Sequence, residues 1–356
     1  MTTLYLIEPH STVRLDGDTL IVSIPEDKAR QVEKRQVRVP LMKVDQVIVQ
    51  GDATLTTPAV LALLEQHADI CYCTYYGQFR GHLTPELSKN GILRIQQHQA
   101  RQRYRQRITL ASRFVTGKLA NQRTLLLRSN RKLENDDVAQ AAATIQVLLQ
   151  QAEEITALTD TEPDPSQPQT GTPLGRLFGL EGAAGAAYFG VFGHLLHSGL
   201  GTDWQGRLKR PPPDPINALL SYGYVLLASK VASAISIVGL DPYVGYLHST
   251  QYGKQALALD LMEEFRPVIV DSVVLTLVNN RILQPEHFES ELGSARLTDA
   301  GRRRFLEQFE TRLNTEIAHP VFKYKATYYR CLELQTRLLA KTVSGELTDY
   351  VPFVVR

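Results

Sequence analysis

The spacing of apolar residues changes near residue 91, and this change limits the folds open to the chain. Before it, short alternating or β-branched runs predict strands, and Asp16-Gly17 between two such runs predicts a hairpin. After it, the apolar spacing is helical to the end of the chain. The sequence therefore predicts an α+β protein with a small β-rich domain at 1–91 and a larger all-α domain at 92–356. Within the second domain, 159–171 has the composition of a mobile loop.

The first helical segment is long and strongly basic. It has no proline for over thirty residues, which predicts one helix or two that break near Gly117. Between Gly91 and Lys132 there are eleven Lys or Arg residues and no Asp or Glu. A helix that is merely solvated would usually include acidic partners, so this segment is a candidate surface for a polyanion. Arginines four residues apart would form basic faces that contact phosphates. The candidate DNA contacts are Arg101, Arg103, Arg105 and Arg107.

Other polar residues could also contact DNA. Asn217, Ser221 and Tyr222 fall in the first turns of the helix that follows the sequence PPPDP, where an exposed amide, hydroxyl and phenol could meet DNA. The alternative is that Asn217 caps this helix and Tyr222 packs in the core. Lys254, in a predicted loop, could bind a phosphate or simply be exposed.

Three acidic residues interrupt an otherwise apolar helix that begins near Gln255 and continues past Pro267. Asp260, Glu263 and Glu264 occupy positions i, i+3 and i+4, which predicts that their carboxylates share one face. On a solvent-exposed face, like charges at this spacing would cost roughly a few tenths of a kcal/mol each. A divalent cation would reverse the sign of that cost, so this face is a candidate wall of a metal site.

A second isolated acid matches the first group. Glu181 lies in a Gly/Ala-rich apolar helix, and a buried carboxylate without a partner would destabilise the fold. His248, on a Gly-flanked turn, could add a nitrogen ligand, although a lone histidine is often structural. Two carboxylates and a neutral imidazole suit Mn²⁺ or Mg²⁺ and balance its charge. The residues alone thus suggest a site made of Glu181, His248 and an acid of the Gln255 helix.

Cysteine usage and hydropathy indicate the cellular compartment. Cys71, Cys73 and Cys331 form neither a disulfide framework nor a zinc pattern, and the first two are expected on one face of a strand. No N-terminal signal is recognisable, and the longest apolar stretches are shorter than the roughly 20 residues that span a bilayer. We expect a cytoplasmic protein with no membrane partner. The net charge of +2 indicates no particular ligand.

Four sequence blocks resemble a known family. They are LEGAAGAAYF, LKRPPPDPINALLSYGYVLL, GYLHS followed by ALDLMEEFRP, and SGELTDYVPFVVR. In this order, over essentially the whole chain, they resemble the CRISPR-associated spacer integrases, the near-universal adaptation proteins of CRISPR systems. The resemblance implies a β-rich N-terminal domain, expected to take part in dimerisation, and a helical catalytic domain.

The resemblance also implies the roles of particular residues. Glu181, His248 and Glu263 match the metal ligands of the family, with Mn²⁺ or Mg²⁺ as the cofactor. Asp260 matches a further catalytic acid, expected beside the metal or as an alternate ligand. Glu264 is expected to be a solvated or structural residue, with Arg266 as its candidate partner. Lys209 and Arg210 stand where relatives often have consecutive arginines, candidates for phosphate contact.

The implied activity is the joining of short DNA fragments to the CRISPR repeat. The 3′-hydroxyl ends would attack a phosphodiester by metal-dependent transesterification, which requires no covalent protein nucleophile. The implied partners are double-stranded and branched DNA, a second copy of the chain in a homodimer, and a second small adaptation protein. A non-catalytic DNA-binding scaffold of the same fold is the alternative. A small-molecule metallohydrolase would leave the basic segment unexplained.

Overall fold

The structure is a computed structural model of the chain. It describes residues 3–28, 32–75, 77, 79–86, 90–157, 161, 171–197, 199–201, 204–208, 211–249, 251–291 and 293–355. The expected mobile loop at 159–171 lies almost entirely outside these residues. The chain divides into two compact units, residues 1–89 and 90–356, and each is described by itself.

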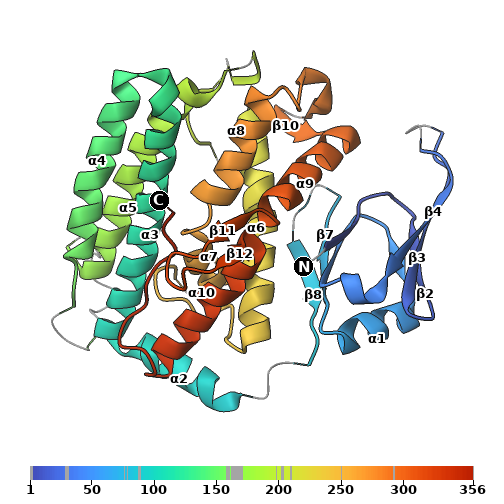
Figure 1. Ribbon diagram of the computed structural model, residues 1–356, viewed down its shortest axis with the longest axis horizontal. Helices are drawn as coiled ribbons and strands as arrows, with labels where there is room; N and C mark the ends of the chain where they lie inside the picture. The colour runs from blue at the N-terminus through green and yellow to red at the C-terminus, as the bar shows by residue number, and fades with distance from the viewer. Residues whose placement is uncertain are drawn as a thin grey trace. The chain divides into compact units, whose positions relative to one another are not determined.

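The described residues of the first unit form two four-stranded sheets and one α-helix (Figure 1). One sheet has the order β1 (Thr3–Leu6), β5 (Gln46–Gln50), β7 (Asp69–Cys73) and β8 (Phe79–Leu83). The other has the order β4 (Arg35–Pro40), β3 (Thr19–Ile24), β2 (Thr12–Asp16) and β6 (Thr54–Leu55). Helix α1 (Thr57–Glu65) completes the unit. The predicted strand-rich N-terminal region is confirmed.

Apolar side chains from both sheets and from α1 form the core of this unit. Val13 and Leu20 come from one sheet, Val47 and Ile70 from the other, and Leu63 from α1; all five are fully buried. Their burial excludes apolar surface from water, which is the main favourable contribution to folding.

Two local predictions for this unit are confirmed. Strands β2 and β3 pair as an antiparallel hairpin, and Gly17 at its turn has φ of +56°, a conformation that glycine adopts without steric cost. Cys71 and Cys73 of β7 are both buried, and their Sγ atoms lie 3.8 Å apart. Residues two apart on a strand share a face, as predicted for this pair.

The second unit is mainly helical. Its helices are α2 (Gly91–Gln102), α3 (Tyr104–Leu133), α4 (Asp136–Glu153), α5 (Pro173–Val191), α6 (Pro215–Val238), α7 (Ala256–Met262), α8 (Ser272–Asn279), α9 (Asp299–Leu313) and α10 (Tyr328–Val343). Helices α3, α4 and α5 lie side by side (Figure 1). The predicted helical region is confirmed, but it also contains two short hairpins that were not expected: β9 (Phe288–Glu291) with β10 (Ser294–Leu297), and β11 (Glu316–Ala318) with β12 (Lys325–Thr327).

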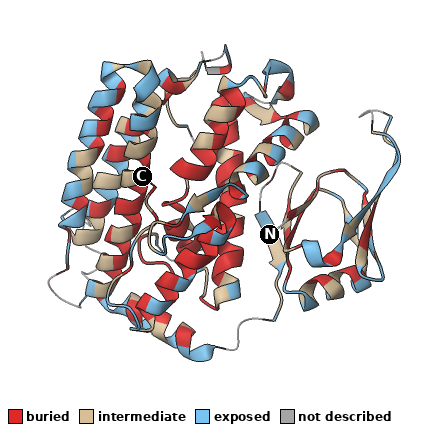
Figure 2. Ribbon diagram, in the orientation of Figure 1, coloured by how far each residue is buried: buried red, intermediate tan, exposed pale blue. Residues whose placement is uncertain are grey.

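Helix α6 is a long and strongly apolar helix of the second unit. It is long and apolar enough to cross a membrane by length and composition, but 78% of that stretch is buried inside the structure (Figure 2). Asp214 caps its N-terminus by accepting a hydrogen bond from the backbone N–H of Asn217, and Pro215 occupies the first turn. This burial is typical of the core helix of a soluble domain.

The predicted break near Gly117 is wrong. Helix α3 continues through Gly117, and the break lies at Arg103, whose backbone is extended with φ of −75° and ψ of 101°. Gly117 instead permits close packing, because a Cβ there would lie 2.9 Å from both Glu264 Cγ and Pro352 Cβ. The glycine is therefore needed for close packing of α3 against the segment after α7 and the C-terminal segment, and not for a bend.

The expected single helix after Gln255 is interrupted. Helix α7 ends at Met262, and a π-helical turn (Pro267–Asp271) joins the chain to α8. Proline in a helix removes one backbone donor and crowds the preceding turn, which favours such an irregularity. After Met262 the backbone hydrogen bonds no longer follow the regular α-helical pattern, since Glu263 N–H bonds to the Asp260 carbonyl, three residues back.

His319 lies buried after β11. Its Nδ1 accepts hydrogen bonds from the backbone N–H groups of Val321 and Phe322, at 3.2 and 3.3 Å. Its ring contacts those of Phe322 and Phe353, with centroids 4.9 and 5.6 Å apart. Burial, aided by the charge of Lys323, lowers the pKa of His319 to about 4. The imidazole is thus neutral at physiological pH.

We expect His319 to make the fold sensitive to mild acid. Its pKa in the folded chain is lower than the value of about 6.5 in an unfolded chain, so the unfolded state binds the proton first as pH falls. The contribution is complete above about pH 6.5 and is lost progressively toward pH 4. Melting temperatures at pH 7.5 and pH 5 should fall less for His319→Gln than for the unchanged protein. An equal fall in both would contradict this assignment.

Candidate metal centre

Asp260 holds the turn that carries His248. The carboxylate is fully buried and accepts hydrogen bonds from the backbone N–H groups of Tyr246, Leu247 and His248, at 2.6, 2.9 and 2.8 Å. It also lies 2.7 Å from His248 Nδ1. With Nδ1 engaged by a carboxylate, Nε2 is the ring nitrogen left for a metal, an arrangement common to histidine ligands. Asp260 therefore orients the imidazole.

The turn needs glycine at position 245. A Cβ on Gly245 would lie 2.7 Å from Asp260 Oδ2 and 2.8 Å from the backbone of Ala256. We expect Gly245→Ala to displace the turn and lower the free energy of unfolding by about 1–3 kcal/mol. Gly190→Ala is the control, because a Cβ at that helical position meets no atom within 4 Å. Equal stability of the two variants in urea denaturation would contradict the prediction.

Helices α2 and α3 hold the same segment from both sides of the break between them. On α2, the Gln97 side chain donates to the carbonyls of Asp241 and Val244, at 2.9 and 3.0 Å. On α3, Arg107 Nε donates to the Tyr246 carbonyl at 2.9 Å. The backbone that leads into the histidine turn is therefore bound by side chains of both helices.

Glu263 is a buried, ionised carboxylate. Arg266 donates to its two oxygens at 2.8 and 3.0 Å, and the Lys118 ammonium lies 2.7 Å from Oε2. Burial alone would raise the pKa of Glu263, but Arg266, Lys118 and His248 together hold it well below its usual range. The carboxylate is therefore available as an anionic ligand.

Lys118 joins Glu263 to Glu181. Its ammonium also contacts Glu181 Oε1, so one buried cation from α3 lies between the carboxylates of α5 and of the segment after α7. The ring of Phe178, one helical turn before Glu181, contacts the ring of His248 with centroids 6.3 Å apart. The structure thus brings Glu181, His248 and Glu263 into one neighbourhood from three separate parts of the chain.

The donor set fits a hard divalent cation, but the predicted triad is not closed around a common point. Among the described residues, no group of three His, Cys, Asp or Glu side chains lies close enough to hold a metal ion. The space between the two glutamates is spanned by the Lys118 ammonium. Lys118 already holds the two carboxylates close together, and Asp260 binds Nδ1 of the neighbouring imidazole. Carboxylate oxygens and an imidazole nitrogen are ligand types that Mn²⁺ or Mg²⁺ would take.

Glu264 points away from this centre. It is fully buried and accepts hydrogen bonds from Tyr350 Oη at 2.8 Å, the Phe353 backbone N–H at 2.6 Å and the Gln335 side chain at 3.3 Å. Burial raises its pKa to about 8 despite these donors. Its expected pairing with Arg266 is wrong, because that guanidinium bonds to Glu263.

The prediction that the three acids share one face is also wrong. Asp260 contacts the histidine turn, Glu263 contacts Lys118 and Arg266, and Glu264 contacts the C-terminal segment. Helix α7 ends between the first acid and the other two, so regular helical spacing does not apply.

A second polar group supports Arg266. Its guanidinium lies 4.0 Å from the ring centroid of Tyr224, a cation–π contact. Tyr224 and Tyr188 donate hydrogen bonds to the buried Asp271 at 2.6 and 2.9 Å. Burial raises the pKa of Asp271, although these donors and Arg266 oppose the rise. The contact with Tyr224, which is itself hydrogen-bonded to Asp271, therefore helps to hold the Arg266 guanidinium beside Glu263.

The four predicted arginine contacts differ in exposure. Arg103 and Arg105 are exposed and Arg101 is partly buried. Arg107 is buried and bonded to the Tyr246 carbonyl, so its prediction as a surface contact is wrong. The break at Arg103 also places Arg101 and Arg105 on different helices, which removes the predicted continuous face.

Asn217 and Tyr222 are not surface groups. Asn217 is fully buried, with its amide donating to Asp214 and to the Gly206 carbonyl at 2.6 and 3.0 Å. Tyr222 is buried against Phe305, with ring centroids 5.1 Å apart. The prediction of exposed DNA contacts is therefore wrong for both. Tyr222 packs in the core, as the alternative expected, whereas the residue that caps α6 is Asp214 and not Asn217.

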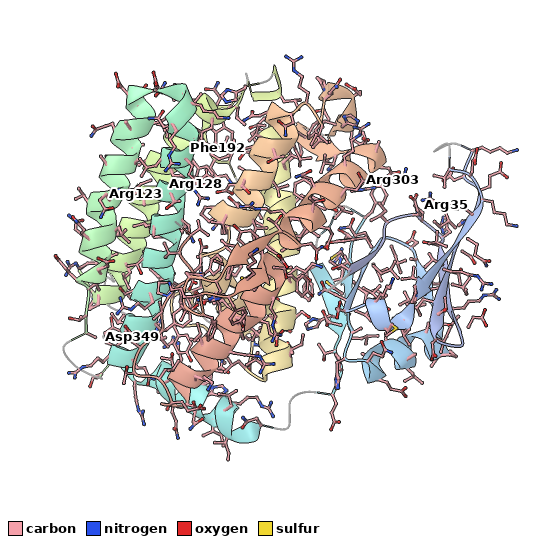
Figure 3. The ribbon with its side chains drawn as sticks, viewed as in Figure 1. Arg35, Arg123, Arg128, Phe192, Arg303 and Asp349 are labelled. Atoms are coloured by element: carbon pink, nitrogen blue, oxygen red, sulfur yellow. The ribbon has the colours of Figure 1, made fainter. Side chains whose placement is uncertain are left out.

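The remaining basic candidates differ in their exposure to solvent. Lys254 is partly exposed in the loop before α7, whereas Lys209 and Arg210 lie outside the described residues. Farther along α3, Arg123 is partly exposed and Arg128 exposed (Figure 3). The basic surface of α3 thus extends beyond the arginines first considered.

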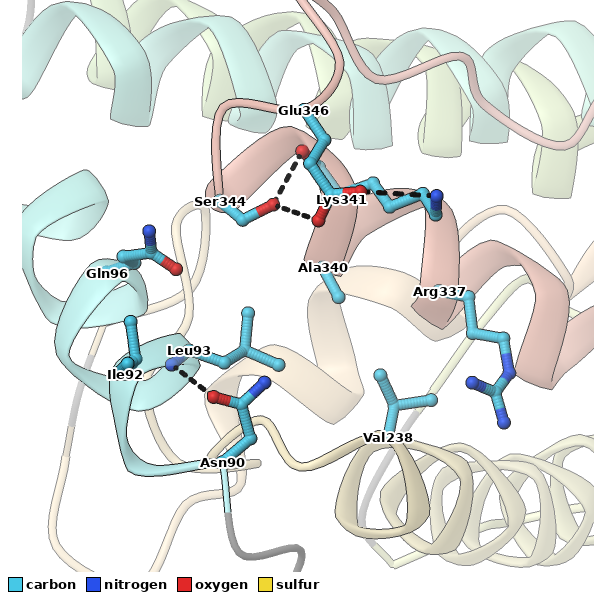
Figure 4. Close-up of a pocket in the computed structure, with 10 residues that line it drawn as sticks. All are labelled: Asn90, Ile92, Leu93, Gln96, Val238, Arg337, Ala340, Lys341, Ser344 and Glu346. Carbon is cyan, nitrogen blue, oxygen red and sulfur yellow. Dashed lines mark hydrogen bonds and ion pairs between the residues drawn. The ribbon is translucent and has the colours of Figure 1, made fainter.

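A cavity of about 520 Å³ lies elsewhere in the helical unit, where the start of α2 meets the ends of α6 and α10 (Figure 4). Leu93 and Val238 line its apolar side, and Lys341 pairs with Glu346 at 3.3 Å at its edge. No predicted site residue is among those that line it. The candidate chemistry therefore lies at Lys118 and its neighbours and not in this cavity.

Comparison with known proteins gives the family. The family model for CRISPR associated protein Cas1 matches residues 4–311. A CRISPR-associated exonuclease Cas4/endonuclease Cas1 fusion from Geobacter sulfurreducens is 38% identical over 357 residues, which cover 99% of this chain and 60% of the fusion. CRISPR-associated endonuclease Cas1 3 of Thermus thermophilus is 36% identical over 352 residues, covering 99% of this chain and 97% of the relative.

A solved structure supports the fold independently. The structure of a casposase bound to integration product superimposes with a TM-score of 0.81 at 22% sequence identity, covering 99% of this chain and 93% of the casposase. The sequence match extends over most of the chain, and the two relatives share more than a third of its residues. This chain belongs to the Cas1 family of CRISPR-associated proteins.

Proposed function

We propose that this protein is a divalent-metal-dependent DNA endonuclease and integrase of CRISPR adaptation. One observation carries the proposal: Glu181 and Glu263, from distant parts of the chain, meet at one buried cation beside an imidazole oriented by Asp260. The relatives named endonucleases and the casposase bound to integration product support the same class of chemistry.

Each residue has a distinct part in this proposal. Glu181, Glu263 and His248 Nε2 would hold Mn²⁺ or Mg²⁺, and Asp260 keeps the imidazole in the required orientation and tautomer. A bound divalent cation polarises phosphate oxygens and stabilises the attacking and leaving oxygens. Arg266 bonds to both oxygens of Glu263 and so restricts its rotamer.

The DNA surface is proposed to include the exposed basic residues near the break between α2 and α3. Arg103 and Arg105 are the exposed members, with Lys254 near the histidine turn. Such contacts position a phosphate backbone without reading its sequence. Double-stranded and branched DNA are the proposed substrates of this cytoplasmic protein. A homodimer and a second small adaptation protein are proposed as partners on the basis of family membership.

The test is strand transfer and cleavage of a branched DNA in Mn²⁺, with and without a chelator. Both reactions should stop when the metal is removed and return when Mn²⁺ is restored. DNA binding at low salt should persist in the chelator, since it depends on Arg103 and Arg105. Binding without any metal-dependent reaction would favour the non-catalytic scaffold, and reaction undiminished by the chelator would contradict the metal site.

A further inference from the structure

Lys118 is a buried charged side chain placed among the proposed metal ligands. Its side chain is 5% exposed, whereas other basic residues of α3, such as Arg105 and Arg128, are exposed. The ammonium lies 2.7 Å from Glu263 Oε2 and also contacts Glu181. Burying a lysine is unfavourable unless it is paired, and here its partners are the two carboxylates that the proposed function assigns to the metal.

The local charge balance shows what this lysine does. Glu181, Glu263 and Asp260 contribute three negative charges, and Lys118 and Arg266 contribute two positive charges, which leaves −1 before any charge on the imidazole is counted. A divalent cation added to this set would give +1. The same set without Lys118 would carry −2, a stronger attraction for the same cation. Lys118 therefore lowers the affinity of the site for metal.

The two basic residues differ in how firmly they are held. Arg266 bonds to both oxygens of Glu263 and stacks on Tyr224, so it is fixed from two sides. The ion pairs described for the Lys118 ammonium are with the two proposed ligands. A lysine also has a flexible four-carbon stem, which allows the ammonium to withdraw without moving the backbone. Of the two basic side chains, Lys118 is thus the one that a metal ion can displace from the glutamates.

We propose that Lys118 is a positioning residue that acts as an internal counter-cation: it holds Glu181 and Glu263 together and competes with the divalent metal for their oxygens. The inference rests on the proposed function, because it takes these glutamates as ligands. A consequence is that the metal binds weakly to the protein alone. A DNA phosphodiester supplies the negative charge that a site of net +1 lacks, so metal and DNA bind cooperatively, each raising the affinity of the other.

The first experiment measures Mn²⁺ affinity by isothermal titration calorimetry without DNA. Lys118→Met, which keeps the unbranched chain to within one atom of its length and removes its charge, should bind Mn²⁺ roughly tenfold or more tightly than the unchanged protein. Its melting temperature should be lower without metal and should rise more on adding Mn²⁺. Mn²⁺ affinity that is unchanged or weaker in Lys118→Met would overturn the proposal.

Lys230→Met is the matched control. Lys230 is also a fully buried lysine of the helical unit, paired with Glu310 at 3.3 Å, but it is not part of the proposed centre. This variant should also melt at a lower temperature, with no change in Mn²⁺ affinity. A purely structural role for Lys118 predicts that the two variants behave alike.

A second measurement uses the unchanged protein, so it does not depend on a variant that folds. Lysine acetylation followed by mass spectrometry should label Lys118 slowly without metal and faster in saturating Mn²⁺, while Lys230 stays protected in both. Glu181→Gln should weaken Mn²⁺ binding. Mn²⁺ binding that is unchanged in Glu181→Gln would contradict the metal site itself. Weaker Mn²⁺ binding in Glu181→Gln, together with a rate of Lys118 acetylation that does not change with Mn²⁺, would contradict only the proposed role of Lys118.

Discussion

Glu181→Gln is expected to lose nearly all metal-dependent strand transfer while the protein stays folded. The substitution removes one of the two carboxylates that would hold the metal and keeps the shape of the side chain. Charge stabilisation by a metal contributes several kcal/mol to the transition state, and each 1.36 kcal/mol is tenfold in rate, so a loss of about a thousandfold is expected. Because the Glu181 side chain is 29% exposed, the melting temperature should change little. The measurement is strand transfer in Mn²⁺ with a thermal melt of the same sample.

Glu310→Gln is the control for this prediction. Glu310 is likewise a partly buried glutamate paired with a buried lysine, Lys230, so the substitution removes a comparable ion pair outside the centre. It should retain strand transfer. Activity in Glu181→Gln equal to that of Glu310→Gln would remove Glu181 from the ligand set.

Phe353→Ala is expected to destabilise the helical unit strongly. Phe353 is fully buried and stacks on Phe265, with ring centroids 4.7 Å apart. Truncating a buried phenylalanine typically costs about 3–5 kcal/mol through lost transfer energy and the cavity left behind. Because the backbone N–H of Phe353 also bonds to Glu264, the residue after the proposed ligand Glu263, disorder here would reach the centre. Urea denaturation measures the loss, and strand transfer should fall with it.

Val351→Ala is the matched change two residues earlier. Val351 is 51% exposed, so its truncation should alter the free energy of unfolding by roughly 0.5 kcal/mol or less. A similar small effect for Phe353→Ala would mean that the C-terminal segment contributes little to stability.

Periodicity predicted the order of structure types but not where the long basic segment breaks. The strand-rich first part, the hairpin at Gly17 and the helical second part follow from local patterns that hold whatever the tertiary contacts. Nothing local marks Arg103 as a helix end, whereas Gly117 carries a local breaker signal. Tertiary packing decided the outcome, because Gly117 is needed where α3 meets Glu264 and Pro352.

The acids of the candidate centre could be proposed from the sequence, but the cation between two of them was missed. Glu181 can be recognised from the sequence because a buried acid in an apolar, Gly-rich helix needs a partner. The same argument applies to Lys118, which follows Gly117 in an apolar stretch, and it would have found this residue. The burial of Arg107 had no comparable signal, because its partner is the backbone carbonyl of Tyr246, 139 residues away in the sequence.

The residues around the break between α2 and α3 contact both the solvent and the buried histidine turn. Arg103 and Arg105 face solvent there, while Gln97 and Arg107 bind the backbone that precedes the imidazole. A change in the angle between these two helices would therefore alter the separation of His248 from the glutamates. Binding of a polyanion to Arg103 and Arg105 could change this angle and so control when the site is able to react. Distance measurements between spin labels on α2 and α3 would detect such a change.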